Sequence, residues 1–241
     1  GSRVVYLGDN ASGSQFLVVG DQESDAIRGL SYLAIAPVGN HVLAAGFNQV
    51  VLDGKMLPTL PGQVYQPLFN SDGSHYAFVV QNSNGPVVYL DGVPQRAYSA
   101  FQADGSYYTF SPDGKHLAYF CHAASASAGN EEGVCLDGKY LPQGQGNALA
   151  NLMFSSDSNH LFWSFRQGAN MRVFVDNKPV LDGGASSPGG TSAQAWQPDG
   201  KDGLIVLVHD TDSFKRVTIT PASSSSVAGM LGGGPAVASA H

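Results

Sequence analysis

Histidine recurs at one position of this sequence, directly before an apolar segment. In the phrase FSPDGKHLAYF (residues 110–120) it stands two residues after a glycine, and four related phrases occur elsewhere. The four histidines at this position are His41, His75, His116 and His160. Metal ligands must all lie within about 2 Å of one ion, whereas equivalent repeat positions meet only close to a common axis. We therefore expect each histidine to bind a turn aspartate or a neighbouring backbone group, rather than a metal or a pH-sensing cluster.

Carboxylates are the second residue type that could do chemistry. The chain has sixteen aspartates and three glutamates, and nine of the aspartates precede a glycine, which is typical of tight turns. Calcium sites and glycosidases need carboxylates that converge, whereas this repeat spreads them along the chain. We expect no catalytic residue, no metal and no cofactor. A ligand- or carbohydrate-binding protein with an axial pocket remains the alternative, and its carboxylates would come from Asp9, Asp21, Asp25, Asp210 and Asp212.

Cys121 and Cys135 are the only cysteines, and both fall in one predicted hairpin. A disulfide between neighbouring antiparallel strands is geometrically feasible and suits an oxidising compartment. Two buried free thiols are the alternative, and the sequence leaves the choice open. Two cysteines without a CxxC spacing do not make a closed zinc site.

The histidine phrase belongs to a repeat. The turn centres Gly39, Gly73, Gly114, Ser158 and Gly200 are 34, 41, 44 and 42 residues apart. Four residues before each centre stands a large apolar side chain, which we expect to pack in the core. These repeat-core residues are Ile35, Phe69, Phe110, Phe154 and Trp196. The turns APVGN and SSDSN depart from the Asp-Gly pattern, so we expect them to be looser.

A second phrase alternates with the first, and LDGKxLP occurs twice, at 52–58 and 136–142. Each period of about 42 residues therefore holds two hairpins, or four strands. A period of this length with four strands is the signature of a β-propeller blade. We predict an all-β fold, a five-bladed β-propeller of four-stranded antiparallel blades, with six blades as the alternative.

The phrase FSPDGK followed by an apolar strand resembles the TolB-type, WD-repeat-like propeller repeats of bacteria. The resemblance covers residues 31–220 and is most specific at Phe110–Tyr119. It implies a propeller, but the same repeat occurs in binding proteins, protease accessory domains and envelope scaffolds, so it does not specify a function.

The two ends of the chain decide how such a propeller closes. We predict one propeller domain over residues 1–220, closed by an N-terminal strand that completes the last blade. Residues 221–241 are rich in Ser, Gly and Ala and contain no Asp, Glu, Lys or Arg. The apolar residues with which this tail could dock, on its own chain or on another, are Val227, Met230, Leu231 and Val237.

Composition limits the classes of partner. A net charge of −7 with only twelve basic residues argues against a nucleic-acid-binding surface, and no long apolar run predicts a membrane span. We predict a non-catalytic scaffold that makes protein–protein contacts, including contacts with copies of itself, in an extracellular or periplasmic assembly.

Overall fold

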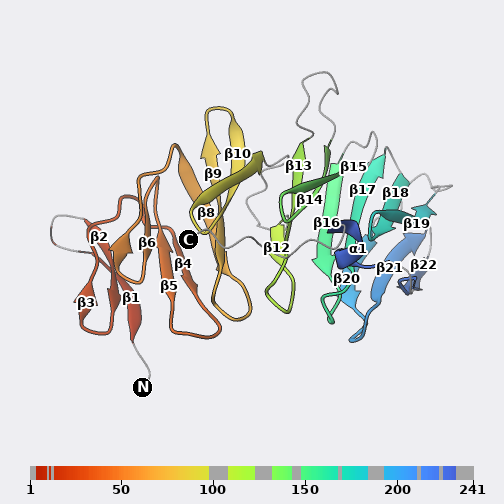
Figure 1. Ribbon diagram of the computed structural model, residues 1–241, viewed down its shortest axis with the longest axis horizontal. Helices are drawn as coiled ribbons and strands as arrows, with labels where there is room; N and C mark the ends of the chain where they lie inside the picture. Colours follow the sequence, from red (N-terminus) through yellow and green to blue (C-terminus); the bar gives the residue numbers. More distant parts are fainter. Residues whose placement is uncertain are drawn as a thin grey trace. The chain divides into compact units, whose positions relative to one another are not determined.

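The computed structural model describes residues 4–9, 11, 14–97, 108–122, 132–142, 148–167, 170–183, 193–210, 213–222 and 225–231. The chain forms two compact units, residues 1–103 (unit 1) and 104–241 (unit 2). Figure 1 shows their strands in sequence colours. The prediction of a single domain over residues 1–220 stays a prediction.

Unit 1 contains three antiparallel sheets, each a simple meander. The first sheet consists of β1 (Val5–Asp9), β2 (Gln15–Val19) and β3 (Gln22–Glu23). The second sheet consists of β4 (Tyr32–Ile35), β5 (Val42–Ala45), β6 (Val50–Leu52) and β7 (Lys55–Met56). The third sheet consists of β8 (Gln63–Phe69), β9 (Tyr76–Asn82), β10 (Gly85–Leu90) and β11 (Val93–Ala97).

Unit 2 repeats this pattern and adds one short helix. The fourth sheet consists of β12 (Tyr108–Phe110), β13 (Leu117–His122), β14 (Glu132–Leu136) and β15 (Lys139–Pro142). The fifth sheet consists of β16 (Ala148–Phe154), β17 (Leu161–Gln167), β18 (Asn170–Val175) and β19 (Lys178–Gly183). The sixth sheet consists of β20 (Ala193–Pro198), β21 (Leu204–Asp210) and β22 (Ser213–Ile219), and α1 (Val227–Leu231) follows it. The all-β prediction is confirmed.

The second turn of each four-stranded sheet is a two-residue hairpin turn. Asp53 and Gly54 have φ angles of 52° and 83°, and Asp91–Gly92, Asp137–Gly138 and Asp176–Asn177 also have positive φ. Two successive residues with positive φ define the turn whose twist matches that of the flanking strands. The repeated Asp-Gly and Asp-Asn pairs therefore set the strand pairing of each sheet, as the sequence predicted.

The first turn of the fifth sheet, SSDSN, is not looser than its counterparts. Ser158 is buried, with a φ of 66°, and its N–H donates to the Ser155 carbonyl over 3.0 Å. Gly114 makes the same bond in the fourth sheet. A left-handed serine costs about 1–2 kcal/mol. Its hydroxyl offsets this cost by accepting the N–H of Asp113 over 2.9 Å, which joins the first turns of two neighbouring sheets.

The turn APVGN of the second sheet is built differently, because its positive φ angles fall at Gly39 and Asn40. This turn also touches that of the next sheet. A Cβ added at Gly73, which has a φ of 78°, would lie 2.3 Å from the Val38 carbonyl oxygen. Val38 and Gly73 hold the same repeat positions as Asp113 and Ser158, so the second and third sheets meet at their turns as the fourth and fifth do.

Neighbouring sheets within a unit pack face to face. Alternate residues of β5 point to opposite sides: Val42 and Ala44 join the core between the first and second sheets, and Leu43 and Ala45 join the core between the second and third. A corresponding core lies between the fifth and sixth sheets. Stacking thus buries both faces of an inner sheet.

Only some of the five residues predicted to pack in the core of the repeat are buried. Phe154 is 4% exposed, and Phe69 and Phe110 are half-buried, whereas the side chain of Trp196 lies outside the described residues. Ile35 is 58% exposed, so its assignment to the core is wrong. Ile35 pairs with Val42 and therefore faces the first sheet, which has too few strands to cover it.

The N-terminal strands form a sheet of their own, so the predicted closure by an N-terminal strand is not what residues 5–23 do. β1 pairs with β2, and β2 pairs with β3. The β2–β3 hairpin, VVGDQE, corresponds to the β6–β7 hairpin, VVLDGKM, because Val19 pairs with Gln22 as Leu52 pairs with Lys55. The first sheet therefore supplies the second, third and fourth strands of the repeat and no first strand.

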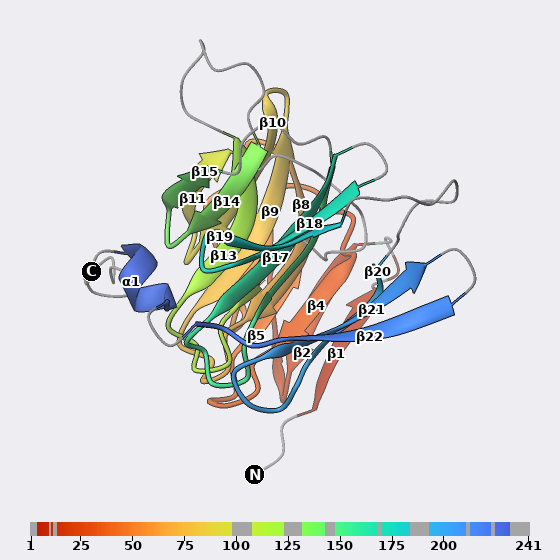
Figure 2. The same cartoon turned by 90° about the vertical axis from the view of Figure 1, so that its right-hand side faces the viewer.

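The segment after β22 does not form a fourth strand within the described residues. It leads to α1, which lies outside the strands of unit 2 (Figure 2). Among the residues that the structure describes, no helix is long and apolar enough to cross a membrane.

Candidate functional site

The four repeated histidines each bind an aspartate in the second turn of their own sheet. The distance from Nδ1 of the histidine to Oδ2 of the aspartate is 2.6–2.7 Å in every pair. The pairs are His41–Asp53, His75–Asp91, His116–Asp137 and His160–Asp176. The structural interpretation of the histidines is confirmed, but the aspartate that each one binds lies in the second turn of its sheet and not in the turn that directly precedes the histidine.

The same aspartate also holds the backbone. In the fifth sheet, Oδ1 of Asp176 accepts the Leu161 N–H over 2.9 Å, and the Asp176 N–H donates to the Leu161 carbonyl over 3.0 Å. The other three pairs make the same two bonds. Because both oxygens of the carboxylate bind groups of its own sheet, the pair fastens the first turn to the second turn. Its role in the sheet is structural.

The four pairs differ in how far they are covered. The side chains of His41 and Asp53 are 47% and 41% exposed, whereas those of His160 and Asp176 are 10% and 1% exposed. The residues around the buried pair include the segment 225–231, which lines the same hollow as Asp176. One local motif is therefore open in unit 1 and shielded in unit 2.

The aspartates of the first turns are also bound within their turns. Burial acts to raise the pKa of Asp157, but hydrogen bonds from Ser155 and Asn159 outweigh it and lower the pKa below 3.8. The pKa of Asp72 is lowered chiefly by the hydrogen bond from the Ser74 hydroxyl. These carboxylates are charged structural ties, not proton donors.

No metal site is evident in the part of the chain that the structure describes. There, no three His, Cys, Asp or Glu side chains are arranged to hold an ion. Of the aspartates suggested for a ligand site, Asp9, Asp21 and Asp25 belong to unit 1 and Asp210 to unit 2, while Asp212 lies outside the described residues.

Cys121 and Cys135 are joined by a disulfide with a Cα–Cα distance of 5.8 Å. The bond links β13 to β14 in the core of the fourth sheet, where both residues are fully buried. A disulfide at this place is compatible with an oxidising compartment.

An exposed apolar surface, which the sequence pattern hardly indicated, lies at the edge of β1 that pairs with no described strand. Val5 and Leu7 lie on the side of β1 that faces the second sheet, and Leu33 and Ile35 face them from β4. A hollow of about 270 Å³ is lined by Val5, Val19, Ile35 and two further residues. The name "edge surface" is used below for β1 together with Leu33 and Ile35.

The edge surface lies where a first strand of the first sheet would stand. In two other places the first strands of neighbouring sheets touch each other: β4 touches β8, and β12 touches β16. The described part of the first sheet has no such strand, so Leu7, Leu33 and Ile35 remain exposed. Among the described residues, β1 pairs with β2 alone, and no described strand pairs with its other edge. The signal in the sequence was the likeness of RVVYLGDN to a later strand of the repeat.

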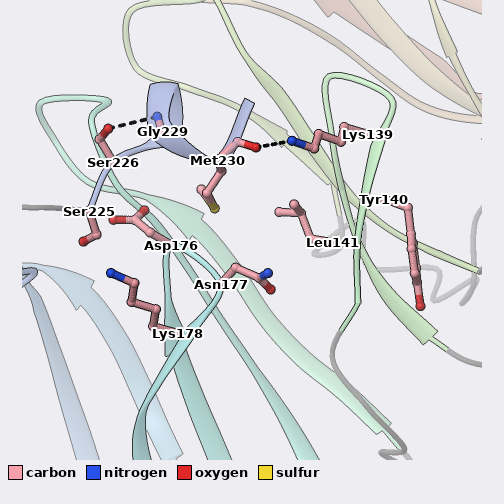
Figure 3. A pocket seen from close by; sticks show the side chains of 10 residues that line it. All are labelled: Lys139, Tyr140, Leu141, Asp176, Asn177, Lys178, Ser225, Ser226, Gly229 and Met230. Atoms are coloured by element: carbon pink, nitrogen blue, oxygen red, sulfur yellow. Dashed lines mark hydrogen bonds between the residues drawn. The ribbon is translucent and has the colours of Figure 1, made fainter. Parts of the chain in front are cut away.

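Residues 225–231, called the docked segment below, bind within unit 2. Val227 is 1% exposed and its N–H donates to the Asn159 carbonyl over 2.7 Å. At the other end of α1, the Lys139 ammonium donates to the Met230 carbonyl (Figure 3). Ser226 caps the helix by accepting the Gly229 N–H over 3.1 Å. Val237 of the predicted docking tail lies outside the described residues.

A hollow of about 470 Å³ remains beside the docked segment. Its walls are Lys139–Leu141 of the fourth sheet, the turn Asp176–Lys178 of the fifth sheet, and the docked segment itself (Figure 3). Sequence reasoning found Val227 and Met230 but missed Lys139, although Lys139 stands in the repeated phrase LDGKxLP.

The sequence matches no family model and no curated protein. Solved structures do match. A eukaryotic initiation factor is 14% identical with a TM-score of 0.52, over 90% of this chain and 60% of that one. A putative TolB from Agrobacterium tumefaciens is 14% identical with a TM-score of 0.42, over 89% and 81%. TolB from Acinetobacter baumannii is 16% identical with a TM-score of 0.41, over 92% and 64%.

These similarities concern the fold alone, since all identities are low. The antiparallel three- and four-stranded sheets of this chain are consistent with the predicted propeller. The chain spans less than two thirds of the initiation factor and of the A. baumannii TolB.

Proposed function

We propose that this protein is a non-catalytic β-propeller scaffold that makes protein–protein contacts and associates with copies of itself. The edge surface carries the proposal. An apolar surface beside an unpaired strand edge is what a protein needs in order to accept a strand from another chain.

The partner that fits this surface best is the β1 strand of a second copy. Two β1 edges related by a twofold axis run antiparallel, so the two first sheets would join into one continuous sheet. Each copy would then cover Leu7 and Ile35 of the other. A five-residue strand makes a small contact, and we expect a dissociation constant of about 1–100 µM, as for interfaces below about 1,200 Å².

The absence of a catalytic role is part of the proposal. It is supported by the use of the repeated histidines and aspartates inside their own turns. The six sheets that the described residues form favour the six-bladed alternative over five blades. The buried disulfide supports an extracellular or periplasmic location, where such a scaffold would belong to an envelope or extracellular assembly.

Sedimentation of the full chain over a concentration series tests the proposal. We expect a reversible monomer–dimer equilibrium, and we expect Ile35→Lys to weaken it by about tenfold or more, because a charge would be buried against an apolar partner. Val180→Lys is the matched control, since Val180 is also an exposed, β-branched apolar residue, 46% exposed, and it lies on unit 2.

Two results would contradict the proposal. The first is a chain that stays monomeric into the millimolar range. The second is a dimer that Ile35→Lys and Val180→Lys weaken equally, because association would then not involve the edge surface.

A further inference from the structure

The docked segment shows what kind of ligand the turns of two neighbouring sheets can hold. It is one helical turn whose ends are bound by different sheets: the fifth sheet binds its first N–H through the Asn159 carbonyl, and the fourth sheet binds a terminal carbonyl through Lys139. The first N–H groups and last C=O groups of a helix have no partner within it. Such a turn is therefore suited to be held at both ends.

The same groups recur in unit 1. LDGKMLP at 52–58 differs from LDGKYLP at 136–142 in one residue, so Lys55 and Leu57 stand where Lys139 and Leu141 stand. In the next sheet, Ser74 holds the position of Asn159, and the turn Asp91–Val93 that of Asp176–Lys178. We call Lys55–Leu57, Ser74 and Asp91–Val93 the open site.

The relative placement of these groups is also repeated. The second and third sheets touch through Val38 and Gly73, which are the positions of Asp113 and Ser158 where the fourth and fifth sheets touch. They also share a core that Leu57 and Tyr89 enter. Because the contact at the turns recurs, Lys55 and Ser74 should lie about as far apart as Lys139 and Asn159.

The open site is uncovered. Lys55, Ser74 and Gly92 are exposed, and Val93 is 46% exposed. The pair beneath it shows the same difference, since His75 and Asp91 are 24% and 32% exposed against 10% and 1% for His160 and Asp176. Unit 1 thus presents the counterparts of the groups that bind the docked segment, and no comparable segment among the described residues is docked on them.

We propose that the open site binds one helical turn of a partner protein, with the chemistry of the docked segment: uncharged, serine-capped, and with an apolar β-branched residue at its start. This inference rests on the proposed role in protein contacts and adds a second site to it. The chain's own segment is held in unit 2, so the ligand comes from another polypeptide.

The charges of the open site select such a ligand. The Lys55 ammonium can donate hydrogen bonds but cannot accept them, which favours a helix C-terminal carbonyl as its partner. The Asp91 carboxylate binds His75 at 2.6 Å and the Tyr76 N–H at 3.0 Å, and it would repel an acidic side chain on the ligand. Val93 replaces Lys178 and adds apolar area for the β-branched residue.

The hollow between the first and second sheets provides an internal comparison. It measures about 430 Å³ and is lined by Val19–Gln22 and the turn Asp53–Gly54. Gln22 stands there at the position of Lys55 and Lys139, as the pairing of Val19 with Gln22 shows. Without the lysine, this place should not bind the ligand.

A blocked synthetic peptide with the sequence of residues 221–231, carrying a photo-crosslinker at the position of the exposed Ala228, tests the inference on the full chain. We expect crosslinks at residues 55–57 and 91–93. Lys55→Ala should reduce their yield about tenfold, since a hydrogen bond from a charged group is lost. Lys201→Ala, at an exposed lysine of the sixth sheet, should leave the yield unchanged.

Two outcomes would overturn the inference. Crosslinks confined to residues 139–141 and 176–178 would mean that the peptide only exchanges with the docked segment. A yield no higher than that of a peptide with aspartate in place of its valine, at millimolar concentration, would mean that the open site does not bind. The Ile35→Lys chain separates the two proposals, because it should lose self-association and keep the crosslinks at the open site.

Discussion

Ile35 and Phe154 hold the same position of the repeat, yet one is exposed and the other is buried. Ile35 ends β4 in unit 1 and is 58% exposed, whereas Phe154 ends β16 in unit 2 and is 4% exposed. The strand ends themselves are alike, since Ile35 pairs with Val42 as Phe154 pairs with Leu161 at the start of the next strand. What differs is the neighbour. β12 covers β16, whereas no first strand of the first sheet covers β4 within the part of the chain that the structure describes.

The two regions show that the repeat controls local structure and the neighbour controls burial. The His–Asp pair, the hairpin turns and the strand register are the same in unit 1 and unit 2, because they depend on residues within one sheet. Exposure depends on what stacks against that sheet, and the repeat phrase carries no information about it. Within the described residues, the edge surface lacks a covering first strand, and the open site lacks a docked helical turn.

The largest effect should come from shortening the two side chains of this comparison. Phe154→Ala should lower the free energy of unfolding by about 3–5 kcal/mol, because it removes a buried ring and leaves a cavity. Ile35→Ala should change it by about 0.5 kcal/mol or less, as exposed substitutions do. Denaturant unfolding of both variants measures the difference, and equal losses would show that Ile35 is covered in solution.

The sequence predicted those features that lie within one repeat. The all-β class, the Asp-Gly hairpin turns and the histidine–aspartate bonds follow from Gly, Asp and His at fixed spacings, and the structure has them. The looser SSDSN turn was wrong, because the Ser158 hydroxyl finds a donor on Asp113 in the neighbouring sheet. Such contacts join residues 45 positions apart and leave no local pattern.

Closure was mispredicted for the same physical reason. RVVYLGDN and SQFLVVG each resemble a strand that could complete a distant sheet, but they pair with each other. Local pairing requires closing only a short loop, which costs less entropy than bringing the chain ends together. The role of Lys139 was missed because its partner, the Met230 carbonyl, is a backbone atom 91 residues away.

Removing the disulfide should destabilise unit 2 and not unit 1. The cysteines are 14 residues apart, and a bond closing a loop of this size stabilises by about 3 kcal/mol. In unit 1 the corresponding positions hold Val80 and Tyr89, which need no such bond because they pack in the core. Hydrogen exchange of the Cys121→Val/Cys135→Val double variant should show faster opening of β13 and β14 with β9 and β10 unchanged. Unchanged exchange in both units would contradict this expectation.

The His–Asp pairs should differ in strength between the units. His160→Ala leaves the buried carboxylate of Asp176 short of one hydrogen bond, at a cost of about 1–3 kcal/mol. His41→Ala breaks a pair that is nearly half exposed, where water can replace the imidazole, and should cost about 1 kcal/mol or less. Denaturant unfolding gives both values. A larger loss for His41→Ala than for His160→Ala would mean that coverage by the docked segment does not strengthen the pair.

The smallest effect, and the one that should be equal in both units, is the acid dependence of the first turns. The pKa values of Asp72 in unit 1 and Asp157 in unit 2 are both lowered from 3.8, the former chiefly by the Ser74 hydroxyl and the latter by bonds that outweigh its burial. A depressed folded pKa adds stability that is present above the unfolded value and lost as the pH falls through the folded value. The free energy of unfolding should therefore decrease below pH 3.8, and Asp72→Asn and Asp157→Asn should each reduce that decrease. Because these bonds lie within one turn, the two variants should act equally and additively in unfolding measured at pH 5 and pH 3. If only Asp157→Asn changed the acid dependence, first-turn chemistry would also depend on the neighbouring sheet, and the separation between local structure and coverage would fail.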